Sequence, residues 1–384
     1  MRIAMVSDCY HPVINGVVTS VSCLVKALEV QGLEVELFVP DDHRPYQDEG
    51  VIHRFASAPF WLHKEERFTY PWPPAAVRPL WTGRFDLVHI HTPFNLGGLA
   101  GAVAAVRGLP RVFTHHTLWE EYSHYLPLPQ RWVKPLAVWI CRTMCQVSQR
   151  VVAPSREVRE RLRAQQVTRP IDVIPTGIDP DVFRGGDPSL AESWLGLESG
   201  QALFLHIGRV AREKSIEVVL RCFAEASRQR PGLKLAVVGD GPARAEMEAL
   251  AGSLEADITF LGFRPRNELK HLMARARGLL FASQTETQGL VLLEAQAAGV
   301  PVVAVAASGT SEGVDPGRSG LLLEPGDERS FVGAILRLLD DAKFFQELSR
   351  NARLFAQEFS SSSMAEKMVR CYSLAIAQKG QKHP

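Results

Sequence analysis

The order of short strands and amphipathic helices constrains the fold more than any other feature of the sequence. Apolar runs at 3–7 and 34–39 flank a stretch, 17–29, whose apolar residues recur at helical spacing. A strand, a helix and a second strand in this order form a βαβ unit with parallel strands. The alternation stops at 175–188, which holds three prolines and three glycines, and restarts at 202–207. We therefore predict an α/β protein of two doubly wound, Rossmann-like domains that face a cleft.

A chain of 384 residues is too long for one ordinary hydrophobic core, which agrees with two domains. We expect a first domain, a linker, a second domain, and a last helix with a polar tail, the helix returning to the first domain. These parts span 1–175, 176–188, 189–361 and 362–384. Residues 41–81 are rich in proline, histidine and aromatic residues, and their pattern is hard to assign.

Composition excludes several classes of protein. The formal net charge is +1, so no strong overall field favours a nucleic-acid partner. No apolar stretch approaches about 18 residues, and the first residues lack the apolar core of a signal peptide, so we expect a cytoplasmic protein. The six cysteines show no metal-ligand spacing, which favours buried, reduced thiols.

Residues 284–304 carry two carboxylates, Glu286 and Glu294, around an expected helix start at Gly289. The free N–H groups from Gly289 to Val291 and the positive end of the helix dipole suit an anion. A ligand with a phosphate at this helix end and hydroxyl groups on both sides would touch all three features. That description fits a nucleotide-sugar.

A second loop of the same domain offers positive charge. Gly208 follows the strand expected at 202–207, and its lack of a side chain lets the backbone approach a ligand. Arg209 and Lys214 lie within one loop, where both could face a diphosphate. The alternative is that they are two solvated surface cations.

Histidines mark the ends of two expected strands in the first domain: His89, His91, His115 and His116. A zinc site would need a third ligand in register, and no cysteine, aspartate or glutamate supplies one, so we predict no metal. We expect the rings of His89 and His91 to point to opposite faces of their strand. The strand-end position favours a place for His116 in the cleft, where such folds bind ligands.

The segment 126–170 carries nine cations and two anions, a net charge of +7. Trp132 and Trp139 are seven residues apart on an expected helix, so they share one face, with Lys134 and Arg142 on the same helix. Basic residues beside tryptophans suit an anionic membrane surface. The alternative for both tryptophans is ordinary packing in the core.

Taken together, the motifs resemble those of the retaining family-4 glycosyltransferases of the GT-B fold, over nearly the whole chain. The Glu-x7-Glu block with its Ala-x-Gly-x-Pro-Val-Val tail is highly specific. The resemblance is carried by Asn15-Gly16-Val17, His116, Gly208-Arg209 with Lys214, Gly239-Asp240-Gly241-Pro242, Leu261-Gly262-Phe263, Glu286 to Glu294, and Gly320-Leu321-Leu322.

The resemblance implies a role for each matched position, with an acceptor-binding first domain and a nucleotide-sugar-binding second domain. The implied catalytic residues are His116, Glu286, Arg209 and Lys214. The donor diphosphate would lie at Arg209, Lys214 and the N–H groups of Gly289, Leu290 and Val291, with Gly16 near the phosphate and the acceptor. Phe263 would contact the base, Glu294 the ribose and Glu286 the sugar. The acceptor and membrane side is assigned to Asp8, Tyr125, Trp132, Lys134, Trp139 and Arg142.

Two positions depart from the usual family pattern. Ser215 stands where the family often has glycine, and Gln288 stands where it often has phenylalanine. With Gln288, and with the segments 91–94 and 116–125, the sequence is similar to the diacylglycerol glucosyltransferases. This second resemblance agrees with the basic, tryptophan-bearing segment.

We therefore expect a metal-independent, cofactor-free, retaining hexosyltransferase at the inner face of the cell membrane. Its donor is expected to be UDP-glucose and its acceptor 1,2-diacylglycerol. Three enzymatic alternatives stay open: a phosphatidylinositol mannosyltransferase using GDP-mannose, a soluble transferase making a polysaccharide or small glycoside, and a nucleotide-sugar 2-epimerase. A fourth alternative is not an enzyme: a non-catalytic subunit that binds a nucleotide-sugar.

Overall fold

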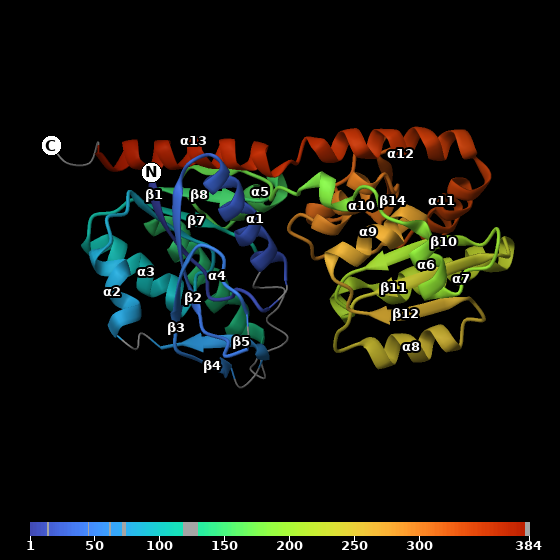
Figure 1. The fold of residues 1–384 in the computed structure, drawn as a ribbon, viewed down its shortest axis with the longest axis horizontal. Helices are drawn as coiled ribbons and strands as arrows, with labels where there is room; N and C mark the ends of the chain where they lie inside the picture. Colours follow the sequence, from blue (N-terminus) through green and yellow to red (C-terminus); the bar gives the residue numbers. More distant parts are fainter. Residues whose placement is uncertain (14, 45, 61–62, 71–73, 118–129, 381–384) are drawn as a thin grey trace. The chain divides into compact units, whose positions relative to one another are not determined.

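The computed structural model describes residues 1–13, 15–44, 46–60, 63–70, 74–117 and 130–380. The chain divides into two compact units. The N-terminal unit is Met1–Gly177 together with the chain from Ser361 onward, and the C-terminal unit is Ile178–Ser360. Each unit is built around its own parallel sheet with helices on both faces (Figure 1). The two parallel sheets with their helices confirm the predicted α/β class of two doubly wound domains.

The N-terminal unit holds a seven-stranded sheet in the order β3-β2-β1-β6-β7-β8-β9. Neighbouring strands are parallel, and the interior strand β1 places Ile3 opposite Val35 of β2 and Leu87 of β6. The strands are β1 (Arg2–Val6), β2 (Glu34–Pro40), β3 (Val51–Phe55), β6 (Leu87–Ile90), β7 (Arg111–Thr114), β8 (Arg150–Ala153) and β9 (Ile171–Val173).

Alternating residues of β1 build a separate core on each face of this sheet. Ile3 and Met5 pack with residues of α1 and α13, whereas Ala4 and Val6 pack with residues of α3, α4 and α5. Successive side chains of a strand point to opposite faces, so one strand serves both cores. The helices are α1 (Gly16–Val30), α2 (Pro74–Thr82), α3 (Asn95–Val106), α4 (Gln130–Val147), α5 (Arg156–Ala164) and α13 (Ser361–Gly380).

Helix α13 ends the described chain but packs on the N-terminal unit, against α1. Met364, Met368 and Tyr372 recur every four residues and are buried, so they form one apolar face. The Tyr372 hydroxyl lies 2.8 Å from Nδ1 of His89, and Nε2 of that ring lies 2.7 Å from Oγ1 of Thr114. These two hydrogen bonds tie α13 to strands β6 and β7.

The C-terminal unit holds a six-stranded parallel sheet in the order β12-β11-β10-β13-β14-β15. The strands are β10 (Ala202–Ile207), β11 (Leu233–Val238), β12 (Ile258–Gly262), β13 (Ala276–Phe281), β14 (Val302–Val305) and β15 (Gly320–Leu323). The helices are α6 (Pro188–Leu195), α7 (Ile216–Gln229), α8 (Arg244–Gly252), α9 (Arg266–Arg275), α10 (Leu290–Ala298), α11 (Glu328–Asp340) and α12 (Ala342–Gln357).

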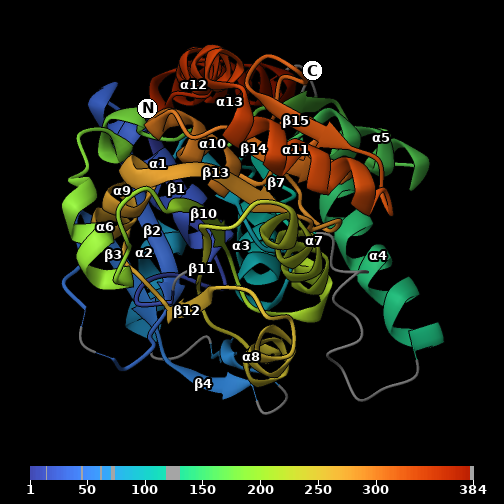
Figure 2. The ribbon, with the colours of Figure 1, turned by 90° about the vertical axis from the view of Figure 1, so that its right-hand side faces the viewer.

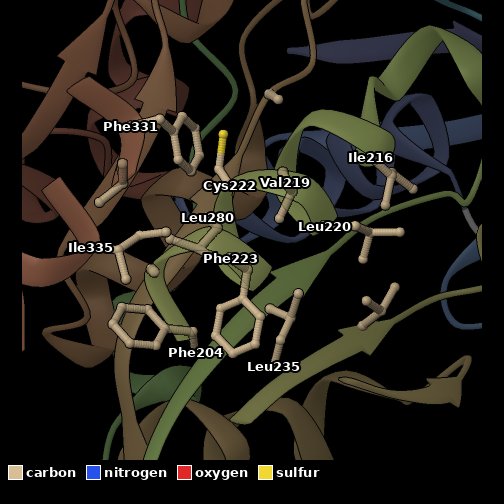
Figure 3. Close-up of a cluster of buried hydrophobic side chains, with 14 of the residues drawn as sticks. Phe204, Ile216, Val219, Leu220, Cys222, Phe223, Leu235, Leu280, Phe331 and Ile335 are labelled. Carbon is tan, nitrogen blue, oxygen red and sulfur yellow. The ribbon is translucent and has the colours of Figure 1, made fainter. Parts of the chain in front are cut away.

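This second sheet is also covered on both faces. Phe204 of β10 packs with Phe223 of α7 and with Phe331 of α11 in one core, which Figure 3 shows. Helices α7 and α11 lie side by side on that face (Figure 2). Leu203 and Leu205 of β10 point to the other face, where residues of α6, α9, α10 and α12 cover them.

Two stretches differ from what the sequence suggests. Residues 41–81 hold β3, the antiparallel hairpin of β4 (Ser57–Phe60) with β5 (His63–Thr69), and α2. The segment expected as a linker at 176–188 is anchored at two points, because Ile178 and Phe183 are buried in the core of the C-terminal unit. Its prolines begin short helices, η2 (Pro180–Phe183) and α6, rather than marking a flexible tether.

Among the helices that the structure describes, none combines the length and apolar character needed to cross a membrane.

One glycine of the C-terminal unit is required by its surroundings. Gly239 directly follows β11 with a φ of 135°, a conformation that residues with a side chain rarely adopt. A Cβ added to it would lie 1.9 Å from the carbonyl oxygen of Gly208, the residue after β10. The absence of a side chain therefore lets the loops after two neighbouring strands touch.

The substitution Gly239→Ala is expected to lower the free energy of unfolding of the C-terminal unit by about 1–3 kcal/mol, because it combines backbone strain with a backbone clash. Chemical denaturation followed by circular dichroism measures the change. The control is Gly252→Ala, at the end of α8, where an added Cβ meets nothing within 4 Å. The control should leave stability unchanged or raise it by up to about 1 kcal/mol. Equal midpoints for the two variants would contradict the assignment.

The substitution Tyr372→Phe is expected to cost about 1–3 kcal/mol of stability in the N-terminal unit, because it leaves a nitrogen of the buried His89 ring without its partner. Ser373→Ala is the matched control on the same helix. The Ser373 hydroxyl is exposed and donates only to the carbonyl oxygen of Val369, one turn earlier. A thermal unfolding curve for Tyr372→Phe that superposes on that of the control would show that the buried hydrogen bond does not tie α13 to the sheet.

Candidate active site

The predicted donor residues lie at the carboxyl edge of the C-terminal sheet, where β10 and β13 are neighbours. Chain order reverses at this pair, because β11 and β12 extend the sheet beyond β10 while β14 and β15 extend it beyond β13. Open α/β sheets bind ligands at such a switch point. The loop after β10 carries Arg209 and Lys214, and the loop after β13 carries Glu286.

Lys214 and Glu286 form an ion pair at this edge. Lys214 Nζ donates a hydrogen bond to Glu286 Oε1 over 2.6 Å, and both side chains are largely shielded from solvent. Burial alone would raise the pKa of Glu286, but the Lys214 ammonium outweighs it, so the pKa lies below its ordinary value. The Glu286 carboxylate is therefore ionised at neutral pH.

Helix α10 begins directly after this loop. Its N-cap is Gly289, in the left-handed conformation with a φ of 68°, and no side chain of the described residues caps the helix end. The first N–H groups, from Leu290 and Val291, therefore lack a side-chain acceptor of their own, and the helix dipole adds positive potential. A phosphate group is the kind of ligand that satisfies both.

Glu294 lies buried on α10 and is bound by a residue that the sequence reasoning missed. Arg266, the first residue of α9, donates from its guanidinium to Glu294 Oε1. Burial raises the pKa of Glu294 above its ordinary value, although the guanidinium opposes that shift. A ribose hydroxyl at Glu294 would meet a carboxyl group that Arg266 already orients.

His206 is a second residue that sequence reasoning missed. It is fully buried near the end of β10, and Nδ1 of its ring lies 3.0 Å from the carbonyl oxygen of Leu280. Its Nε2 has no hydrogen-bond partner among the described residues. Burial, with a smaller contribution from the nearby Lys214, lowers its pKa to about 4, although the hydrogen bond to Leu280 opposes the shift. A polar residue inside the apolar run 202–207 was the signal available in the sequence.

The remaining predicted donor residues are more exposed. Phe263 follows β12 at the edge of the sheet, and 55% of its surface is exposed. Arg209 is half-buried in the loop after β10. That loop is held against the loop after β11, since Val210 N donates to the carbonyl oxygen of Asp240 over 3.0 Å.

The N-terminal unit gathers its own polar residues at the carboxyl edge of its sheet. Asp8 follows β1 and is buried, and it accepts hydrogen bonds from Thr92 Oγ1 over 2.6 Å and from Leu96 N over 2.8 Å. Burial raises its pKa. Asp8 therefore holds the first turn of α3 at the end of β6.

The strand-end histidines form a hydrogen-bonded pair. His91 Nδ1 lies 2.8 Å from His116 Nε2, so the side chains after β6 and β7 meet. Burial lowers the pKa of His116 to about 3 and that of His91 well below its ordinary value. Both rings are neutral at pH 7, where they act as hydrogen-bonding groups rather than cations.

The expected orientation of His89 and His91 is wrong. Their ring centroids lie 4.0 Å apart, because residues two apart on a strand share a face. Among the residues that the structure describes, no three histidine, cysteine, aspartate or glutamate side chains form a group able to hold a metal ion.

The remaining predicted residues of this unit lie in three places. Gly16 is exposed and begins α1, after Asn15, whose side chain caps the helix by accepting from Val18 N over 2.9 Å. Tyr125 lies outside the described residues. Helix α4 carries Trp132, Lys134, Trp139 and Arg142.

Helix α4 exposes its tryptophans. Trp132 is 67% exposed and Trp139 is 62% exposed, with Leu136 between them at 55%, so core packing is excluded for both tryptophans. Lys134 is also exposed, whereas Arg142 is half-buried and donates to Gln166 Oε1 over 3.2 Å. The helix therefore presents apolar and cationic groups together.

Sequence comparison relates each half of the chain to a known family. The model described as "Glycosyltransferase Family 4" matches residues 14–182, and that described as "Glycosyl transferases group 1" matches residues 193–355. An alpha-monoglucosyldiacylglycerol synthase of Streptococcus pneumoniae is 31% identical over 98% of this chain and 86% of its own. One of the same name from Acholeplasma laidlawii is 28% identical over 100% and 99%. A D-inositol 3-phosphate glycosyltransferase of Frankia alni is 33% identical over 77% and 75%.

Solved structures share the fold at lower sequence identity. Sucrose-phosphate synthase from Thermosynechococcus elongatus matches with a TM-score of 0.77 at 23% identity, covering 98% of this chain and 99% of its own. Anabaena HepE in complex with UDP-glucose matches with a TM-score of 0.75 at 19% identity, covering 97% and 99%. The chain therefore belongs to the GT-B glycosyltransferases that join a Glycosyltransferase Family 4 half to a Glycosyl transferases group 1 half.

Proposed function

We propose that this glycosyltransferase moves a glucosyl group from UDP-glucose to the free hydroxyl of 1,2-diacylglycerol, with retention at the anomeric carbon. One observation carries the proposal: the partly buried ion pair of Lys214 and Glu286 adjoins the N-terminus of α10, which no described side chain caps. A cation beside free N–H groups suits a diphosphate, and an ionised carboxylate beside it suits sugar hydroxyls.

The choice of UDP-glucose and of a lipid rests on the relatives. Two of them, similar over nearly the whole of this chain, are named alpha-monoglucosyldiacylglycerol synthases. A structure similar in fold was determined with UDP-glucose bound. The exposed tryptophans and cations of α4 are what an enzyme with a membrane-borne acceptor needs.

The proposal that the anomeric configuration is retained rests on the word alpha in the names of these two relatives. UDP-glucose is α-linked, so an α-glucoside formed from it keeps the configuration of the donor. In the proposed reaction the acceptor hydroxyl attacks from the face that the diphosphate leaves. The bond from the anomeric carbon to phosphate oxygen breaks, the bond to the acceptor oxygen forms, and the acceptor proton passes to the leaving diphosphate.

We propose a different role for each group of residues in the site. Negative charge builds on the diphosphate as it leaves, and Arg209, Lys214 and the N–H groups of α10 would stabilise it where it builds. These groups supply the positive charge that a metal ion provides elsewhere, so we propose a metal-independent reaction. Glu286 would bind the sugar hydroxyls, and the neutral His116 would accept or donate a hydrogen bond near the reacting centre.

We further propose that the protein acts as a peripheral enzyme at the inner face of the cell membrane. Diacylglycerol stays in the bilayer, so the enzyme must come to it. Residues 130–149 contain three cations and no aspartate or glutamate. Anionic headgroups attract such a segment, and tryptophan side chains favour the interface.

A transfer assay tests the proposal directly. Purified protein is given UDP-glucose, UDP-galactose or GDP-mannose, with diacylglycerol in phosphatidylglycerol vesicles as acceptor. We expect glucosyldiacylglycerol from UDP-glucose, with an α-linkage by proton NMR and with activity kept in EDTA. Transfer from GDP-mannose alone would overturn the proposed donor, and a β-linked product would overturn retention. Loss of activity in EDTA that added metal restores would overturn metal independence.

A second candidate is transfer to a small phosphorylated polyol, which the likeness to D-inositol 3-phosphate glycosyltransferases favours. Inositol 3-phosphate is therefore included in the same assay as a soluble acceptor. The exposed apolar face of α4 has no use in that reaction. Turnover of inositol 3-phosphate without vesicles, in the absence of any glycolipid product, would replace the lipid proposal.

The substitution Lys214→Ala should lower kcat by about 100- to 1,000-fold, or about 2.7–4 kcal/mol, because it removes a charge that stabilises the leaving group. The matched control is Arg212→Ala, two residues earlier in the same loop, where an exposed guanidinium pairs with Glu246. The control should turn over normally. Near-normal kcat in Lys214→Ala, with folding verified by circular dichroism, would show that the diphosphate lies elsewhere.

Replacing Trp132 and Trp139 with serine should weaken binding to phosphatidylglycerol vesicles at least about tenfold, because each indole loses a favourable transfer out of water. Sedimentation with the vesicles measures it, and added salt should weaken binding of the unchanged protein as well. Trp81→Ser is the control, since Trp81 is exposed on α2 rather than on α4. If Trp81→Ser weakened vesicle binding as much as the substitutions on α4, the result would show that α4 is not the membrane contact.

A further inference from the structure

An apolar groove runs between helices α3 and α4 of the N-terminal unit. It has a volume of about 320 Å³. Its floor is formed by Gly98, Ala102 and Ala105, which recur at helical spacing on α3, and Trp139 and Thr143 of α4 line its other side. Figure 2 shows α4 in green at the edge of the view.

The groove is open because α3 is built from small residues along this face. A Cβ placed on Gly98 would meet nothing within 4 Å, so this end could accept a larger side chain. Across the groove, Trp139 is 62% exposed and Val147 is 37% exposed. Apolar side chains beside an apolar groove that no described residue fills are expected where a ligand covers them.

The chemistry of the walls selects a hydrocarbon chain. A peptide or sugar would need hydrogen-bond partners along its length, and the lining offers few besides the Thr143 hydroxyl and Arg111. Arg131 and Lys134 precede Trp139 by about one to two turns on the same helix, with no acidic residue at 130–149. Cations beside an apolar groove fit a lipid layer with anionic headgroups.

The position of the groove points to the acceptor rather than to bulk lipid. Its lining includes Pro93, which follows His91 by two residues at the end of β6. His91 contacts His116, the residue proposed to lie near the reacting centre. From Gly98 to Ala105 the helix rises by about 10 Å, so the groove leads away from the strand ends over that length.

We propose that this groove binds one acyl chain of the glycerolipid acceptor while its free hydroxyl lies at the strand ends near His116. The assignment rests on the proposed function, because it takes diacylglycerol as the acceptor. It adds a subsite of the N-terminal unit that selects acceptors by chain length.

Photolabelling tests which lipid occupies the groove. In one arm, diacylglycerol carries a diazirine on an acyl chain in plain phosphatidylglycerol vesicles. In the other arm, phosphatidylglycerol carries the diazirine and the diacylglycerol is plain. We expect the diacylglycerol probe to label peptides spanning 98–105 and 139–147, and unlabelled diacylglycerol to suppress that labelling. Labelling of these peptides by the phosphatidylglycerol probe alone, or by neither probe, overturns the proposal.

Filling the groove tests its effect on turnover. Gly98→Leu places a branched side chain in the open space at the Pro93 end and keeps a good helix former. We expect it to raise KM for dioleoylglycerol at least tenfold and to leave turnover of a diacylglycerol with four-carbon chains within twofold. Val106→Leu is the control on α3, because Val106 is exposed and lies outside the groove lining. Equal KM changes for both acceptors would overturn the subsite.

The two proposals fail in different ways. If the unchanged protein labels at the groove with diacylglycerol but transfers no sugar to it, the proposed function fails and the chain-binding site stands. If it makes glucosyldiacylglycerol without labelling at the groove, and Gly98→Leu behaves like Val106→Leu, the groove assignment fails alone.

Discussion

Parallel pairing of the strands is the constraint on which both candidate sites depend. When neighbouring strands run the same way, their carboxyl ends meet at one edge, so loops far apart in sequence become neighbours. In the C-terminal unit this brings Lys214 to within 2.6 Å of Glu286, 72 residues later. In the N-terminal unit it brings His91 to His116. Each contact joins the loops after two adjacent strands, and neither helix packing nor local turns would create it.

The fold was predictable wherever a strand was apolar and a helix was periodic. Strands β10, β11, β13 and β14 are largely buried on both faces, so their residues form short apolar runs that stand out from the helices. Residues 41–81 gave no such signal, because β5 (His63–Thr69) reads His-Lys-Glu-Glu-Arg-Phe-Thr and pairs only with β4. The structure of 176–188 could not be derived from its composition, because proline and glycine mark helix starts and turns as well as flexible linkers.

The candidate site was predictable only where its features are local. A glycine before an apolar run indicates a helix start, and this placed Gly289 at the N-terminus of α10. The pairing of Arg266 with Glu294 was not readable, because it depends on how α9 packs beside α10. The same holds for His206, whose place under the loops after β10 and β13 follows from the sheet. Spacing finds a loop or a helix end, whereas side-chain partners require the tertiary fold.

Burial has opposite effects on the two groups of residues, and this suggests how the chemistry is divided. The nearby Lys214 ammonium lowers the pKa of Glu286, whereas no described carboxylate pairs with His116 and burial lowers its pKa to about 3. A ring with so low a pKa is a weak base at neutral pH. It is therefore poorly suited to take a proton from an acceptor hydroxyl, and a leaving phosphate oxygen is the stronger base. The Lys214 ammonium suits an anion, whereas the Glu286 carboxylate and the neutral ring suit hydroxyl groups, which is the division proposed for sugar transfer from a nucleotide-sugar.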